Sequence, residues 1–424
     1  MRKNVVIFLA LCFCNSFYIS AQEVFKVMFY NLLNYPLETA VPNREQDLQF
    51  ILSDYQPDLF LVCELNNSTG ANNILNITRN AISTDFEMAT YVSNTSDDNY
   101  GDQNDLQNLL YYNSSKFILE EEIIVPTYLR DFNVYRLKLN STDQATNPIE
   151  FYVIIGHLKA SSGTTNAQSR FDMVEDLEYY LDTLPSNANV ILGGDLNLYT
   201  SSEPAFQELL STNNNITFLD LADRIGSWHN NVNYVDVFSQ STRTQTGMGG
   251  TTGGFDDRFD FILGSESIIA NPDISYVDDS YQVYGNNGLA SCHNSSINSV
   301  YCGDSNSEFS SNIRDALHNF SDHLPVTVLL ETNATLLYVS NVENSKKLLL
   351  EKTLFNDVLT VRLSSEELFN ETLEIYNSLG QKIKTLKTNT EIVQRFDISD
   401  LQGGIYLLAI PKLNLKPLKF IIAN

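Results

Sequence analysis

From Val24 onward the chain alternates short apolar runs with polar loops. Seven apolar runs have the length of β-strands and carry turn-forming residues at their ends. They are FKVMFYNLL, DLFLVCEL, NLLYYN, FYVIIGHL, NVILGGDLN, RFDFILG and HLPVTVLL. Residues 43–53 and 168–184 carry apolar side chains at helical spacing. Strands mixed with helices, without a regular βαβ repeat, predict an α/β or α+β layered sandwich.

The pattern changes near Thr332. Residues 336–424 form short alternating β runs, with Leu379-Gly380 and Gly403-Gly404 as turns between them. This stretch contains no histidine and no cysteine. We expect it to be a small all-β sandwich without catalytic residues.

The first residues indicate export. Arg2 and Lys3 precede an apolar run and then small residues, which predicts a secretory signal peptide over residues 1–21. Lipidation at Cys12 or Cys14 is an alternative, but the preceding Leu11 and Phe13 are not the small residues that it requires. No internal apolar run reaches the length of a membrane span.

Three cysteines remain after the predicted cleavage. Cys292 and Cys302 bracket a short polar loop, which favours a local disulfide in an exported chain. Cys63 lies within an apolar strand and is expected to be a buried free thiol. These spacings make no zinc site.

Charge is concentrated in the first region. Residues 22–332 hold 42 acidic and 13 basic residues, a net charge of −29, whereas residues 333–424 have a net charge of +1. Such an acidic surface repels a nucleic-acid backbone at long range. Most of these charges are expected on a solvated face.

Five predicted strand ends carry polar residues suited to chemistry. They are Asn31, Glu64, His157, Asp195 with Asn197, and Asp322 with His323. A charge at a buried strand end is costly without a partner or a metal ion. Carboxylate and amide oxygens suit Mg²⁺, Mn²⁺ or Ca²⁺, and a histidine can move a proton near neutral pH. Asp260 in RFDFIL is a candidate to orient a histidine.

The ordered motifs resemble the endonuclease/exonuclease/phosphatase superfamily. The motifs are YNLLN at 30–34, CEL at 63–65, GHLKA at 156–160, GGDLN at 193–197, RFDFIL at 258–263 and SDHLPV at 321–326. The resemblance implies a four-layer sandwich of two packed, mainly antiparallel sheets flanked by helices. It also implies a phosphoric ester hydrolase that uses a divalent metal ion.

The same resemblance implies roles for individual residues. Asn31, Glu64 and Asp322 resemble the metal-site residues of the family. The catalytic set would be His157, Asp195, Asn197, Asp260 and His323, with Asp260 orienting His323. A turn-capping role is the alternative for Asn31. The sequence does not reveal the carboxylate that should hold His157.

Four cations are candidate substrate contacts. Lys159, Arg170, Arg243 and Arg258 lie near the motifs and could bind phosphate. The alternative for Lys159 and Arg170 is a solvated surface position. Arg243 belongs to the segment QSTR at 240–243.

The C-terminal stretch has its own resemblance. EIYNSLGQKI followed by DISDLQGGIYLLAI resembles the C-terminal sorting domain of the type IX secretion system. The alternative is a carbohydrate-binding or structural β module. We therefore expect a signal peptide at 1–21, a catalytic domain at 22–332 and a sorting domain at 336–424.

Together these features predict a secreted or surface-attached phosphodiesterase, expected to be monomeric, that acts on DNA or RNA. Partners would be the phosphodiester substrate and, through the C-terminal domain, the secretion machinery. One alternative is a phosphodiesterase for phospholipid or sphingomyelin, or a phosphatase. A second alternative is a non-catalytic surface binding protein on the same fold.

Overall fold

The computed structural model describes residues 22–96, 106–337, 348–350, 352, 354–363, 368–413 and 417–423. The predicted signal peptide lies outside the described residues. Within these ranges, no helix combines the length and the apolar character that a membrane crossing requires.

The first sheet contains seven strands in the order β11-β13-β1-β2-β4-β3, with β12 also paired to β13. β1 runs parallel to β2, and the other pairs are antiparallel. The strands are β1 (Glu23–Tyr35), β2 (Leu59–Leu65), β3 (Phe86–Met88), β4 (Gln107–Asn113), β11 (Ser275–Tyr276), β12 (Gln282–Val283) and β13 (Val326–Thr332). Nearly every side chain of β2 is buried, as expected for a strand covered on both faces.

The second sheet contains six strands in the order β5-β6-β7-β8-β10-β9. β7 and β8 are parallel, and the other pairs are antiparallel. The strands are β5 (Phe117–Val125), β6 (Phe132–Leu139), β7 (Glu150–His157), β8 (Val190–Asp195), β9 (Phe218–Asp220) and β10 (Asp260–Ser265).

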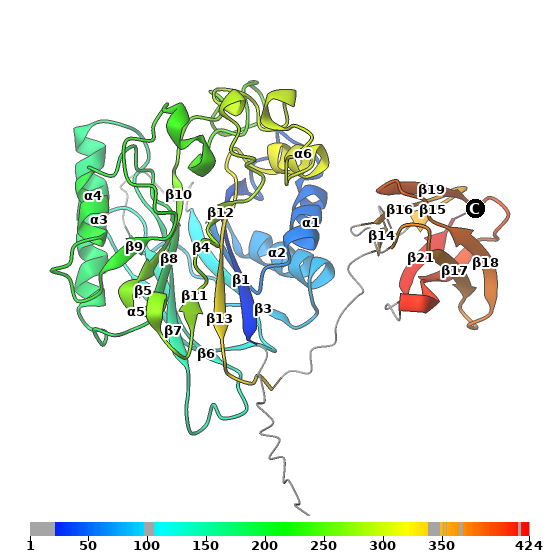
Figure 1. Ribbon diagram of the computed structural model, residues 1–424, viewed down its shortest axis with the longest axis horizontal. Helices are drawn as coiled ribbons and strands as arrows, with labels where there is room; N and C mark the ends of the chain where they lie inside the picture. Colours follow the sequence, from blue (N-terminus) through cyan, green and yellow to red (C-terminus); the bar gives the residue numbers. More distant parts are fainter. Residues whose placement is uncertain are drawn as a thin grey trace, which may run out of the picture.

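The two sheets pack face to face and helices cover their outer faces. A Cβ atom at Gly193 in β8 would lie 2.8 Å from Leu61 Cδ2 in β2, so a side chain here would force the sheets apart. In Figure 1, α3 and α4 flank one side of the sandwich and α1, α2 and α6 the other. The helices are α1 (Arg44–Tyr55), α2 (Ser68–Ala81), α3 (Thr164–Leu181), α4 (Pro204–Leu209), α5 (Glu266–Ala270) and α6 (Ser311–Phe320). The predicted four-layer sandwich is confirmed.

Long loops cover the ends of the strands and contain three short 3₁₀ helices, η1 (Val232–Val237), η2 (Ala290–Cys292) and η3 (Val300–Cys302). Cys292 and Cys302 form the predicted disulfide. Cys63 is buried and free, as predicted.

The C-terminal residues form two small sheets around a separate apolar core, which confirms the predicted all-β character. One sheet has the order β14-β16-β19 and the other β15-β21-β20-β17-β18. The elements are β14 (Leu348–Leu350), β15 (Leu354–Phe355), β16 (Val358–Leu363), β17 (Thr372–Asn377), β18 (Lys382–Lys387), β19 (Val393–Asp397), β20 (Gly404–Ala409), η6 (Pro411–Leu413) and β21 (Leu418–Ile422). The domain boundaries at 332 and 336 stay a prediction.

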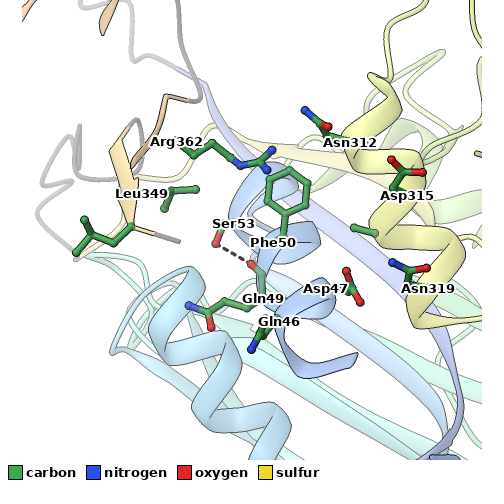
Figure 2. Close-up of a pocket in the computed structure, with 12 residues that line it drawn as sticks. Gln46, Asp47, Gln49, Phe50, Ser53, Asn312, Asp315, Asn319, Leu349 and Arg362 are labelled. Carbon is green, nitrogen blue, oxygen red and sulfur yellow. Dashed lines mark hydrogen bonds between the residues drawn. The ribbon is translucent and has the colours of Figure 1, made fainter. Parts of the chain in front are cut away.

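A pocket of about 440 Å³ is lined by residues of α1, α6, β14 and β16. Figure 2 shows Arg362 beside the ring of Phe50, and the guanidinium carbon lies 4.4 Å from the ring centre. The lining contains no histidine and none of the predicted site residues. The predicted catalytic and metal-site residues lie instead at or near the strand ends.

Candidate active site

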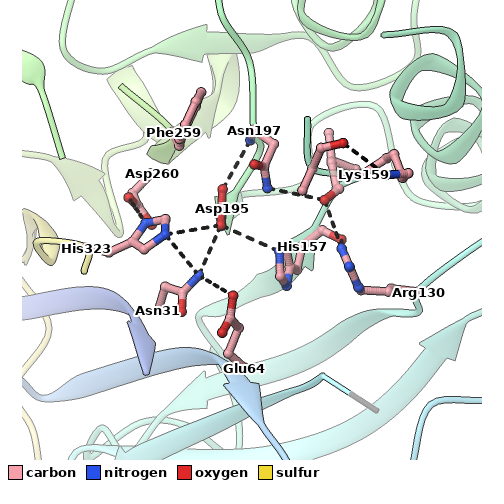
Figure 3. A network of polar contacts seen from close by, with 12 residues as sticks. Asn31, Glu64, Arg130, His157, Lys159, Asp195, Asn197, Phe259, Asp260 and His323 are labelled. Carbon is pink, nitrogen blue, oxygen red and sulfur yellow. Dashed lines mark hydrogen bonds and ion pairs between the residues drawn. The ribbon is translucent and has the colours of Figure 1, made fainter. Parts of the chain in front are cut away.

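The polar strand-end residues meet at one edge of the sandwich. Asn31 and Glu64 lie near the carboxyl ends of the parallel strands β1 and β2, and His157 is paired with Asp195 at the ends of the parallel strands β7 and β8. Asp260 opens the antiparallel strand β10 directly opposite Asp195. Parallel strands end at the same edge, so these side chains point toward one another (Figure 3).

Asn31 connects both sheets. Its Nδ2 atom donates to Glu64 Oε1 and to Asp195 Oδ2, each at 3.0 Å, and lies 3.5 Å from His323 Nε2. Its Oδ1 atom accepts a hydrogen bond from Leu33 N at 3.0 Å. The side chain therefore has a defined orientation at the centre of the cluster, which a turn-capping role alone does not explain.

Asp195 lies between two histidines. Its Oδ2 atom is 3.5 Å from His157 Nε2 and 3.8 Å from His323 Nε2. His323 Nδ1 lies 2.7 Å from Asp260 Oδ2, the arrangement that the sequence predicted for this pair. All four side chains are buried, with at most 3% of each residue exposed.

The two histidines differ in their charge preference. Burial lowers the pKa of His157 well below its ordinary value, and the neighbouring Arg130 and His323 lower it further. Burial alone would also lower the pKa of His323, but Asp260, Asp195 and Asp322 outweigh it and raise that pKa well above its ordinary value. His157 is therefore expected to act as a neutral imidazole, and His323 as a protonated one.

The carboxylates of the site are costly to ionise in this environment. Burial raises the pKa of Asp195 to about 8, and Asp260 and Glu64 contribute to the increase. Burial also raises the pKa of Glu64, with a further contribution from Asp322. A cation placed among these groups would remove the penalty.

The donor set fits a hard divalent cation. Ligand atoms of Glu64, His157 and Asp195 lie within 4.8 Å of one another, and those of Asp195, Asp260 and His323 form a second such group. Asp322 Oδ1 is buried and has no hydrogen-bond partner among the described residues. Oxygen donors of this kind are the ligands that Mg²⁺, Mn²⁺ and Ca²⁺ prefer.

Asp322 is held by the glycine-rich loop at 245–254. Thr251 N donates to Asp322 Oδ2 at 2.6 Å. A Cβ atom at Gly250 would lie 2.5 Å from Asp322 Cγ, and Gly250 has a φ of +63°. Glycine therefore lets the loop backbone approach this carboxylate closely.

The backbone is strained around the cluster. Glu64 and Asn197 have φ values of +58° and +50°, and Leu33 and Asn34 have φ values of +48° and +47°. Non-glycine residues in this region cost on the order of 1–3 kcal/mol each and concentrate at functional sites. Asn197 Nδ2 donates to Leu158 O at 3.3 Å, which fixes its side chain beside His157.

Three of the four predicted substrate cations have structural partners instead. Arg258 is fully buried and forms an ion pair with Asp220 at 2.6 Å. Arg170 is 1% exposed and forms an ion pair with Glu203 at 2.6 Å. Each guanidinium is committed to a buried carboxylate, and the contact of these two arginines with substrate stays a prediction.

Arg243 also has structural partners. It is fully buried and donates to the backbone carbonyls of His318, Asn319, Met248 and Gly249. It therefore anchors the glycine-rich loop to α6, and its contact with substrate stays a prediction. Lys159 differs, because it is partly exposed and its Nζ atom donates to Ala160 O at 3.0 Å.

Sequence reasoning missed Arg130, which lies between β5 and β6. Its Nη1 atom donates to Leu158 O at 3.0 Å and His157 O at 3.3 Å, so its charge lies beside the site (Figure 3). No strand-end pattern marks it in the sequence.

The partner of His157 is not found among the described residues. His157 Nδ1 has no hydrogen-bond partner there. Asn108 donates from Nδ2 to Asp131 O, Asn133 Oδ1 and Ile155 O. Asp105, three residues before Asn108 in the chain, lies outside the described residues.

Comparison with protein families gives one match. Residues 355–424 match the family described as "Secretion system C-terminal sorting domain", which confirms the predicted resemblance of this stretch. The match supports secretion or display at the cell surface. A comparison with curated proteins finds no match.

Solved structures similar to this chain include proteins of the superfamily that the motifs resemble. The human Nocturnin catalytic domain is 14% identical, covers 73% of this chain and 97% of its own, and gives a TM-score of 0.44. TDP2 of D. rerio, solved with a single-strand DNA product, is 16% identical, with 73% and 99% coverage and a TM-score of 0.45. An endonuclease/exonuclease/phosphatase family protein of Bacteroides thetaiotaomicron is 14% identical, with 73% and 96% coverage and a TM-score of 0.43.

Proposed function

We propose that residues 22–332 form a secreted, divalent-metal-dependent phosphodiesterase, with nucleic acid as the first candidate substrate. One observation carries the proposal. The buried Asp195 carboxylate lies between two histidines with opposite pKa shifts, beside a half-buried acid, Glu64. Acid–base groups next to a cation site are the equipment that hydrolysis of a phosphate ester needs.

Asn31, Glu64 and Asp322 would hold the metal ion. The bridging position of Asn31, the raised pKa of Glu64 and the unpartnered oxygen of Asp322 support this assignment. When bound, such an ion neutralises charge on the phosphoryl oxygens and helps to activate water.

Asp195 and Asn197 would position the attacking water. The pKa of Asp195, raised to about 8, suits a group that accepts a proton from water near neutral pH. The water oxygen forms the new bond to phosphorus, and the bond from phosphorus to the leaving oxygen breaks.

The two histidines would bind opposite sides of the reacting phosphate. Protonated His323, oriented by Asp260, would donate to a phosphoryl oxygen. Neutral His157 would donate a hydrogen bond to the leaving oxygen, which is a smaller role than delivering a full proton. Lys159 and Arg130 are the cations we assign to the substrate phosphate.

A specific observation favours the lipid alternative. Val300 and Tyr301 are 82% and 63% exposed, in the loop closed by the disulfide. This loop is joined to the site region, because Ile297 N donates to Thr242 O at 3.0 Å. The net charge of −29 on residues 22–332 also disfavours dense contacts with a nucleic-acid backbone.

A substrate panel tests the proposal and ranks the substrates. The panel contains plasmid DNA, RNA, sphingomyelin vesicles and inositol phosphates, each with Mg²⁺ or Mn²⁺ and with a chelator. We expect chelator-sensitive cleavage of at least DNA or RNA by the intact chain, and loss of cleavage in His323→Ala and Asp195→Ala. Cleavage of vesicles alone would move the assignment to a lipid phosphodiesterase.

If nothing in the panel is cleaved, the phosphodiesterase assignment fails. Calorimetry then examines the remaining alternative, a non-catalytic binding protein. Absence of divalent-metal binding as well would support that alternative.

We further propose that residues 336–424 deliver the chain to a type IX secretion machinery. The family match at 355–424 supports this role. The proposal predicts that a chain without these residues stays in the periplasm of a host that has this machinery, which fractionation and immunoblotting would detect.

A further inference from the structure

The segment 239–242 connects the two halves of the candidate site. Ser239 Oγ accepts hydrogen bonds from Phe259 N and Asp260 N, at 3.2 and 3.1 Å. On its other side, Ser239 O accepts from Leu324 N at 2.7 Å, and Thr242 N donates to Asp322 O at 3.1 Å. The segment therefore connects β10, which begins at Asp260, to Asp322 and His323.

Gln240 lies at the centre of this segment. It forms isolated β-bridges with His323 on one side and Asp257 on the other. Its backbone N donates to Asp257 O at 3.0 Å, and its O accepts from Asp257 N at 2.8 Å. The main chain is thus fixed from two directions, and only 8% of the residue is exposed.

The side-chain amide of Gln240 contacts both neighbouring site residues. Its Nε2 atom lies 2.5 Å from His323 Nε2 and donates to Asp322 Oδ2 at 3.5 Å. His323 Nδ1 faces Asp260 Oδ2 at 2.7 Å. Asp260 and Gln240 therefore hold the imidazole ring at its two nitrogens.

We propose that Gln240 is a positioning residue for the hydrolytic site. It fixes the ring plane of His323 and sets the distance between His323 and the Asp322 carboxylate. The expected loss of activity rests on the proposed phosphodiesterase function. The expected change in the His323 ring is independent of that function. Partners that orient a ligand or a catalytic histidine typically change activity or affinity by about 10–100-fold when removed.

The test uses Gln240→Met, which keeps the length of the side chain and removes both polar atoms. Gln282→Met is the matched control, because Gln282 donates to Glu308 on the surface of the same region, away from the strand-end cluster. The kinetic readout is hydrolysis of bis(p-nitrophenyl) phosphate with Mg²⁺ or Mn²⁺ by the full chain. The second readout is the imidazole nitrogen spectrum of histidine-labelled, metal-free protein, with the His323 signal assigned through His323→Ala.

We expect Gln240→Met to lower kcat by about 10–100-fold with KM changed less than about twofold. We also expect the His323 nitrogen signals to differ from those of the control, while thermal unfolding stays near that of the control. A kcat within twofold of wild type, or His323 signals that match those of the control, would overturn the proposal.

Two further designs keep the test decisive. If Gln240→Met does not fold, Gln240→Glu is used in its place. Gln240→Glu preserves the shape and polarity of the side chain but places a charge beside Asp322. A wild-type kcat together with wild-type His323 signals in Gln240→Glu would equally overturn the proposal. If the wild-type chain hydrolyses none of the substrates, the proposed function fails, and the nitrogen spectrum alone decides the role of Gln240.

Discussion

The two regions of the chain differ in what they bury. Residues 22–337 bury the side chains of Asp195, Asp260, His157, Asp322 and His323, each less than 4% exposed. In the described part of the chain after residue 347, the buried polar side chains are Thr360, Thr388 and Gln394, and none of them is ionisable. Among the described residues of the C-terminal region, no acid, lysine or arginine is therefore buried.

The burial of a charged side chain does not by itself identify the site. Arg258 with Asp220, and Arg170 with Glu203, are also buried in the first region, but each charge has a close opposite partner. The strand-end acids instead surround one another, and burial raises the pKa of Asp195 and Glu64. A buried charge that lacks its partner is thus the more informative signal of chemistry.

The largest effect is expected at Asp195. We expect Asp195→Asn to lower kcat by about 10²–10⁴-fold, as for the loss of a general base. The same change removes a carboxylate that is costly to bury, so the melting temperature should stay unchanged or rise. Enzyme kinetics and thermal unfolding on one sample measure both. Asp397→Asn, an exposed position in the C-terminal region, is the control. Activity and stability falling together would show that Asp195 is a structural residue.

The buried ion pairs should behave in the opposite way. Asp220→Ala leaves Arg258 buried without its carboxylate, which should cost about 3–5 kcal/mol of unfolding free energy. The matched control is Asp236→Ala, which breaks the more exposed pair with Arg224 and should cost less than about 1 kcal/mol. The single tryptophan of the chain, Trp228, is buried in this region, so its fluorescence reports the unfolding. Equal losses of unfolding free energy in the two variants would remove the distinction between an arginine left unpaired in the interior and one left unpaired near the surface.

The stability of the C-terminal region should depend on apolar packing alone. Leu408 and Ile405 both lie in β20, but Leu408 is fully buried whereas Ile405 is 46% exposed. We expect Leu408→Ala to destabilise this region by about 2–5 kcal/mol and Ile405→Ala by much less. Hydrogen exchange of C-terminal peptides measures the change. Phosphodiesterase activity and the Trp228 transition should not move, and a change in either would show that the two cores are coupled.

Much of the site could be predicted because its residues lie at the ends of apolar strands. Glu64, His157 and Asp195 each come directly after an apolar run, and parallel strands bring such ends to one edge. The pairing of Asp260 with His323 was also predicted and is found at 2.7 Å. The catalytic and metal-binding roles of these residues stay predictions.

What the sequence could not show depends on distant partners. Whether an arginine binds substrate or a buried carboxylate is decided by tertiary neighbours, such as Asp220 for Arg258. Strand β5 was not predicted, because its exposed glutamates interrupt the apolar pattern at an edge of the sheet. Gln240 carries no charge and follows no apolar run, so its contact with His323 appears only in the folded chain.

The smallest predicted effect concerns an acid away from the site. Glu178 lies in α3, and burial raises its pKa from 4.5 to about 8, with a further contribution from Glu208. Both of its carboxylate oxygens are buried without a hydrogen-bond partner in the described part of the chain. The folded state therefore binds a proton that the unfolded state has released between pH 4.5 and 8. The stability conferred by the protonated form is complete below pH 4.5 and is lost as the pH rises through about 8.

Glu178→Gln should remove this pH dependence, because the amide stays neutral. We expect the variant to melt above wild type at pH 9, with the difference shrinking toward pH 5. A contribution of about 1 kcal/mol would raise the melting temperature by about 2–4 °C. Glu175→Gln, an exposed position on the same helix, is the control and should show no such trend. The Trp228 fluorescence transition measures both. If Glu178→Gln instead melts below wild type at pH 9, the ionised carboxylate has a stabilising partner, and the protonated form of Glu178 does not stabilise the folded state.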